Sequence, residues 1–101
     1  MLRRGVYSRM HDGNKQKRFR NEAQIEVRED CMIYSTRPVV GEAKRTVLPI
    51  QWQGDRRFTV NWSRVCRHWG KAAIFRAHAE HGVEGLEEQA QHFWRYEGPA
   101  A

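Results

Sequence analysis

Apolar residues occupy every second position on both sides of a short polar stretch near the middle of the chain. A period of two is the spacing of side chains that share one face of a β-strand. The alternating apolar positions are Leu48, Ile50, Trp52, Phe58, Val60 and Trp62. Because Gly54 and Asp55 lie between the two runs, the pattern predicts a β-hairpin from 48 to 62.

The parity of these positions predicts the register of the hairpin. All six are even-numbered, so they share one face only if the numbers of paired residues add up to an even number. A two-residue loop, Gly54-Asp55, would break this parity, whereas a three-residue loop over 54–56 keeps it. The predicted pairs are Trp52 with Phe58, Ile50 with Val60 and Leu48 with Trp62. Pro49 has no N–H to donate, which predicts a strand at a sheet edge or a bulge.

A second hairpin is predicted ahead of this one. Ala23, Ile25 and Val27 alternate with polar residues, and residues 31–34 form an apolar run that suits a partner strand. Glu29 and Asp30 favour the turn between them. Residues 36–43 include a proline and a glycine and are expected to form a loop.

The last third of the chain has apolar spacings typical of helices. Ser63 is a candidate N-cap for a short helix that ends near Gly70, and the Ala-rich stretch 71–81 predicts a second helix. A third helix is predicted over 84–96, where apolar residues recur three or four positions apart. These residues are Val83, Leu86, Ala90, Phe93 and Trp94. The sequence therefore predicts an α+β fold, a small antiparallel sheet of two β-hairpins followed by two or three C-terminal helices packed on one face.

Positive charge is concentrated at the start of the chain. Residues 1–20 hold seven basic residues and one acidic residue, Asp12, which together account for the net charge of +6 of the whole chain. We expect residues 1–20 to form a flexible basic N-terminal arm and residues 21–101 to form a single α+β domain. Such an arm can neutralise phosphates, while Tyr7 and Phe19 offer rings for stacking on bases. A solubilising terminus without a ligand is the open alternative.

A second basic region covers residues 44–76, which hold eight basic side chains against Asp55 alone. Our first hypothesis is a small non-enzymatic binding module that contacts nucleic acid or a nucleoprotein complex through the basic arm and the basic hairpin. The candidate nucleic-acid-binding residues are Arg3, Arg4, Arg9, Lys15, Lys17, Arg18, Arg20, Lys44, Arg45, Arg56, Arg57, Arg64, Arg67 and Lys71. A hairpin tip that is simply polar and exposed is the alternative for this region.

The acidic end of the chain suggests a different partner. Residues 77–101 hold five glutamates against Arg95, and most of them fall on the predicted third helix. The candidate protein-binding residues there are Glu84, Glu87, Glu88 and Trp94. The alternative function is therefore a protein-partner inhibitor or adaptor of the phage or mobile-element type, acting through an acidic C-terminal helix. The same glutamates argue against a helix-turn-helix motif, because they would face phosphates.

No catalytic or cofactor motif is recognisable, so we expect a binding protein without a metal or cofactor rather than an enzyme. A metal-independent ribonuclease remains a second alternative because such sites leave no motif. Its candidate residues are Arg64, Arg67, His68 and His78. Zinc-ligand residue types occur at Cys66, His68, His78, His81 and His92, but their spacing matches no zinc-finger arrangement. Two cysteines, no apolar signal segment and no membrane-length apolar stretch predict a cytoplasmic protein.

Overall fold

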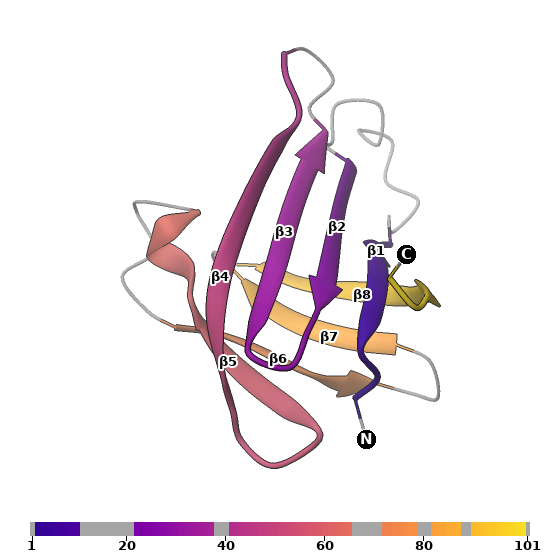
Figure 1. The fold of residues 1–101 in the computed structure, drawn as a ribbon, viewed down its shortest axis with the longest axis vertical. Coiled ribbons are helices and arrows are strands. Elements are labelled where there is room, and N and C mark those ends of the chain that lie inside the picture. Colours follow the sequence, from indigo (N-terminus) through magenta and orange to yellow (C-terminus); the bar gives the residue numbers. More distant parts are fainter. Residues whose placement is uncertain are drawn as a thin grey trace.

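The structure is a computed structural model that describes residues 2–10, 22–37, 41–65, 72–78, 82–87 and 90–100. These residues form a closed barrel of eight antiparallel strands, in which each strand pairs with the next and β8 pairs with β1 (Figure 1). The strands are β1 (Gly5–Arg9), β2 (Glu22–Val27), β3 (Cys31–Arg37), β4 (Lys44–Trp52), β5 (Arg57–Asn61), β6 (Ala72–His78), β7 (Gly82–Glu87) and β8 (Ala90–Gly98). The predicted α+β fold is therefore wrong: in the described part of the chain the one helical element is a single 3-10 turn, η2 (Trp62–Arg64).

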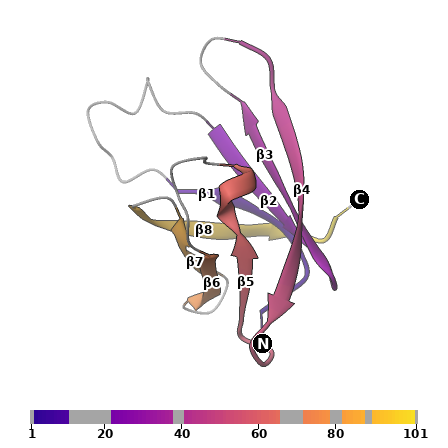
Figure 2. The same ribbon diagram turned by 90° about the vertical axis from the view of Figure 1, so that its left-hand side faces the viewer.

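The two ends of the barrel are named here after the two ends of β4. The Lys44 end contains Arg9, Glu22, Arg37 and η2, and the Trp52 end contains the β2–β3 and β4–β5 turns together with Gly98. Strands β2–β4 run upright in Figure 1 while β6–β8 run across them, so the two halves of the barrel cross steeply. Figure 2 views the barrel from the side on which η2 and β5 lie.

Alternate side chains of each strand point into the barrel, where aromatic rings fill much of the interior. Tyr34 lies 4.9 Å from Trp62 and 6.3 Å from Trp94 between ring centroids, and Phe75 packs beside both tryptophans. Eight strands enclose a space just wide enough for side chains to fill. Phe58 stacks on Phe75 at 5.4 Å and extends this aromatic core toward the Trp52 end.

Both predicted hairpins are present. Ile50 pairs with Val60 and Trp52 with Phe58, and the N–H of Gln53 bonds to the carbonyl of Arg57, so the three-residue loop over 54–56 is confirmed. The third predicted pair does not form, because Trp62 has left β5 for η2. Strands β2 and β3 are joined by the predicted turn at Glu29-Asp30.

Pro49 lies where β4 pairs with β3 but not with β5, so the side of β4 that its nitrogen faces is unpaired there. Its neighbour Ile50 donates its N–H to the carbonyl of Asp30, on the β3 side. Successive N–H groups of a strand point to opposite sides, so the nitrogen of Pro49 points toward β5. The β4–β5 ladder ends at the Ile50–Val60 pair, so the missing N–H costs no ladder bond.

The predicted helix over 71–81 is a strand in its described part, 72–78. Ala73 and Phe75 are fully buried inside the barrel, whereas Ala72, Ile74 and Arg76 face outward. The period of two is concealed in the sequence because the outward Ala72 and Ile74 are also apolar. Alanine then favours the helical interpretation through its intrinsic propensity, which tertiary pairing overrides.

The predicted helix over 84–96 is two strands, β7 and β8. Val83 and Trp94 face each other across these strands and point inward, while Phe93 points outward. The three- and four-residue spacings of the apolar residues arise because inward residues, Val83 and Trp94, are combined with the outward Phe93 across two strands. The predicted N-cap at Ser63 is also wrong by two positions: Asn61 caps η2, its Oδ1 accepting the N–H of Ser63 at 3.1 Å.

The start of the chain contributes to the barrel. Strand β1 lies within the segment expected to form a flexible arm, and it pairs with both β2 and β8. Leu2 and Tyr7 are buried, and the N–H of Leu2 donates to the carbonyl of Asp55 at 2.8 Å. Residues 11–20 of the expected arm lie outside the described residues.

Candidate nucleic-acid interface

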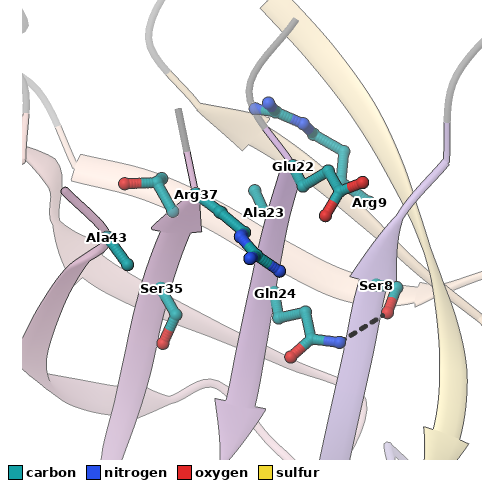
Figure 3. Close-up of a pocket in the computed structure, with 9 residues that line it drawn as sticks. Ser8, Arg9, Glu22, Ala23, Gln24, Ser35, Arg37 and Ala43 are labelled. Carbon is teal, nitrogen blue, oxygen red and sulfur yellow. Dashed lines mark hydrogen bonds between the residues drawn. The ribbon is translucent and has the colours of Figure 1, made fainter. Parts of the chain in front are cut away.

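A pocket of about 440 Å³ lies near the Lys44 end of β1, β2 and β3 and is lined by residues from both faces of these strands (Figure 3). Ser8, Gln24 and Ser35 line it and point outward, because the residues next to them along each strand point into the barrel. They are direct neighbours across three strands, with Ser8 opposite Gln24 and Gln24 opposite Ser35. The amide Nε2 of Gln24 donates to Oγ of Ser8 at 3.1 Å. Part of the pocket lining is therefore a row of hydrogen-bonding groups.

This polar row ends in a guanidinium on each side. Ser8 pairs with Arg95 of β8, and Ser35 pairs with Arg45 of β4, so the row crosses five strands. Strands in a sheet are spaced by about 4.8 Å, which makes the row about 19 Å long. Arg95 donates to Glu97 at 3.2 Å, an exposed contact that water screens.

Three charged side chains lie on the Lys44 side of the polar row and also line the pocket. Arg37 and Glu22 lie opposite each other on β3 and β2, and Arg9 approaches from β1 (Figure 3). Neither a hydrogen bond nor an ion pair joins Arg37 to another described residue. The pocket thus presents an exposed guanidinium beside hydroxyl and amide groups, with Glu22 as the opposing charge.

A second group of functional side chains lies on the outer face of β6–β8. Nε of Arg76 donates to Oε2 of Glu84 at 2.6 Å, and Glu84 is 6% exposed although it faces outward. The hydrogen bond from Arg76 is the main cause that lowers the pKa of Glu84. Phe93 lies opposite Glu84 on β8, and its ring centroid is 4.7 Å from that of His78.

Two arginines face each other directly on this side of the barrel. Arg57 of β5 pairs with Arg76 of β6, and like charges in this position destabilise a sheet. Glu84 neutralises Arg76, but no ion pair joins Arg57 to another residue among those described. The outer face of β5–β8 therefore keeps an uncompensated positive charge on β5, in the same cross-strand row as the exposed ring of Phe93 on β8.

The basic residues predicted to bind nucleic acid separate to opposite ends of the barrel. Strand β4 has nine residues, or about 26 Å at about 3.3 Å per step, so the hairpin tip is remote from the start of its own first strand. At the Lys44 end lie Arg9, Lys44, Arg45 and Arg64, and at the Trp52 end lie Arg3, Arg4, Arg56 and Arg57. Outside the described residues lie Lys15, Lys17, Arg18, Arg20, Arg67 and Lys71. The basic hairpin does not form one continuous site.

Arg3 and Arg4 pack on aromatic rings of the barrel. The guanidinium of Arg4 lies 4.1 Å from the Trp52 ring, and that of Arg3 lies 5.4 Å from the Tyr96 ring. Tyr7, expected as a stacking ring, is buried and donates to the carbonyl of Arg3 at 2.7 Å. These residues hold the Trp52 end together.

The predicted acidic protein-binding surface loses its helix. Glu84 lies in the ion pair with Arg76, and Trp94 is 1% exposed inside the core. Glu88 and the side chain of Glu87 lie outside the described residues.

The ribonuclease candidates are also separated. Arg64 lies in η2 and His78 at the far end of β6, about 20 Å along that strand. Arg67 and His68 fall outside the described residues, as do Cys66 and His81 of the zinc-ligand set. No cluster of three metal-ligating side chains occurs within the described ranges. Burial and the nearby Asp30 raise the pKa of the Cys31 thiol, which disfavours the thiolate.

No family model, curated protein or solved structure matches this chain. Within the described part of the chain, no helix is both long and apolar enough to cross a membrane.

Sequence reasoning missed the residues that the fold brings together. Ser8, Gln24 and Ser35 come from three strands, and only the register makes them one row. Arg37 and Phe93 were not recognised as functional candidates, because Arg37 was predicted to lie in a loop and Phe93 in a helix. The alternation of Ala23, Ile25 and Val27 was the available signal, because it places Gln24 on the outer face.

Proposed function

We propose that this protein is a nucleic-acid-binding module that holds the sugar–phosphate backbone on the outer face of β1–β4. The observation that carries the proposal is the guanidinium of Arg37, which has no described partner and stands over a pocket lined with hydroxyl and amide groups. Arginine binds phosphate through two parallel hydrogen bonds, which makes it the residue best suited to such a contact. Serine and glutamine side chains are common additional donors to phosphate oxygens.

The length of the polar row supports a polymeric ligand. A row of about 19 Å with Arg95 and Arg45 at its ends has room for several consecutive phosphates. The net charge of +6 adds a long-range attraction for a polyanion. Contacts to the backbone position a nucleic acid without reading its bases, so we expect binding that depends little on sequence.

Glu22 gives the proposal an internal control of opposite sign. Its carboxylate lies opposite Arg37 and lines the same pocket, so it repels a phosphate bound there. Glu22→Gln removes that repulsion and keeps a hydrogen-bonding group. The variant is expected to bind nucleic acid more tightly than the unmodified protein.

The test measures the binding of a fluorescently labelled oligonucleotide by anisotropy at several salt concentrations. Arg37→Gln is expected to weaken binding about tenfold and to reduce the slope of log K against log salt by about one. The matched control is Arg28→Gln at the Trp52 end, where Arg28 forms an ion pair with Glu26. Equal effects of Arg37→Gln and Arg28→Gln, or no effect of either, would refute the pocket as the backbone site.

A further inference from the structure

Phe93 is the large aromatic side chain that the described barrel leaves exposed. It is 39% exposed on β8, and its ring lies beside the imidazole of His78 with an interplanar angle of 50°. Met10 and Ile74, which are 50% and 37% exposed, flank the same face. The outer face of β6–β8 and the residue after β1 therefore present exposed apolar side chains around the Arg76–Glu84 ion pair, and nothing in the described structure covers them.

The charges around this surface favour a nucleic acid as its occupant. Arg95 lies two residues from Phe93 on the same face of β8 and keeps 67% of its side chain exposed despite its contact with Glu97. Arg57, which has no ion-pair partner among the described residues, lies three strands away in the cross-strand row of Phe93. An exposed ring among guanidinium groups offers a π-face for a base and cations for the adjoining phosphates. A partner that is apolar alone would leave these guanidinium groups buried without counter-ions.

The aromatic surface is continuous with the pocket on β1–β3. The N–H of Met10 donates to the carbonyl of Phe93 at 2.8 Å, and Arg95, two residues along β8, pairs with Ser8 of the polar row. From β8 to Arg37 on β3 is three strand spacings, or about 14 Å. A few nucleotides cover this distance, since even a stacked strand advances by about 3.4 Å per nucleotide.

We propose that the nucleic acid is single-stranded, with an unpaired base stacked on Phe93 and His78 while the backbone continues to Arg37. This inference rests on the proposed function and specifies its ligand. In a duplex the faces of the bases are covered by their neighbours, so a ring on a rigid strand cannot reach them. The strand holds Phe93 in place, and stacking on it accepts any base.

The experiment uses labelled single strands of about ten nucleotides, one of RNA and one of DNA, and a duplex of the same length. Phe93→Leu keeps an apolar side chain on β8 but removes the ring. It is expected to weaken single-strand binding by about five- to 150-fold and to leave duplex binding unchanged. Phe93→Tyr keeps the ring and is expected to bind single strands like the unmodified protein. The RNA and DNA arms show whether one of the two sugars is preferred.

The outcomes separate this inference from the proposed function. If Arg37→Gln weakens binding to single strands and duplex alike, while Phe93→Leu affects neither, the backbone site stands and the stacking site is refuted. If Phe93→Leu acts and Arg37→Gln does not, the stacking site stands and the pocket fails. The further check is sedimentation of the unmodified protein and of Phe93→Leu without nucleic acid. A lower molecular mass of the Phe93→Leu assembly would show that this face is a contact between copies of the chain, and it would overturn the inference.

Discussion

Gly85 of β7 lies against two buried rings and has no room for a side chain. A Cβ atom there would lie 2.6 Å from Cε2 of Phe75 and 3.0 Å from Nε1 of Trp94. Both rings are at most 1% exposed, so neither can move toward solvent. Such overpacking costs about 1–3 kcal/mol. The reduced freedom of the unfolded chain offsets about 0.4–1 kcal/mol, so Gly85→Ala is expected to lower the free energy of unfolding by about 1–2 kcal/mol, or Tm by roughly 4–16 °C.

Urea unfolding followed by tryptophan fluorescence measures this loss, and a double-mutant cycle identifies its cause. Phe75→Leu removes the ring atoms nearest to the new Cβ, so the two substitutions are expected to couple by at least about 0.5 kcal/mol. Gly54→Ala is the control: Gly54 has a φ of 79° and nothing within 4 Å of its Cβ position, so its cost is a backbone cost. An unchanged unfolding midpoint for Gly85→Ala would refute the packing argument. Equal coupling energies of Gly85→Ala and Gly54→Ala with Phe75→Leu would also refute it.

Two further predictions concern the start of the chain. Leu2→Ala is expected to destabilise the protein by about 2–5 kcal/mol in urea unfolding, because Leu2 is 1% exposed in the core; a cost below about 0.5 kcal/mol would show that this segment does not close the barrel. Burial raises the pKa of Tyr7 to about 12, so the folded state holds its proton longer than the unfolded state does. The resulting stabilisation is complete below about pH 10 and is lost as the pH rises to about 12. Tyr7→Phe is expected to flatten the fall in stability over this pH range, and an identical pH profile for the two proteins would contradict the burial effect.

The strands that the sequence predicts correctly are those with contrasting faces. In β2 the inward Ala23, Ile25 and Val27 alternate with outward polar residues, so the period of two is visible without the fold. In β6 the outward Ile74 is as apolar as its inward neighbours, and the contrast disappears. Alternation can be recognised only where the outer face is polar. On β6–β8 the outer face carries the exposed apolar side chains of the proposed stacking surface, so the strand pattern is concealed there.

The sequence predicts even less of the candidate site than of the fold. The count of charges along the chain placed Lys44 and Arg57 in one basic region. The structure separates them, because Lys44 begins β4 and Arg57 follows the turn at its other end. The pocket residues proposed to bind phosphate are two serines, a glutamine and an arginine, none of which forms a motif in the sequence. They become one site only because the register of three strands places them side by side. Side-chain chemistry that depends on non-local pairing has no periodic signature in one sequence.

The pairing of β1 with β8 imposes an order on folding. Every other strand pair joins neighbours along the chain, whereas Arg9 and Trp94 belong to opposite ends of it. Local hairpins close quickly, and a contact across the whole chain must wait for the largest loss of loop entropy. During synthesis β1 therefore has β2 as its available neighbour until β8 has been made. Until that moment Trp94 is missing from the interior, and chaperones and proteases meet an open, curved sheet with its aromatic lining accessible.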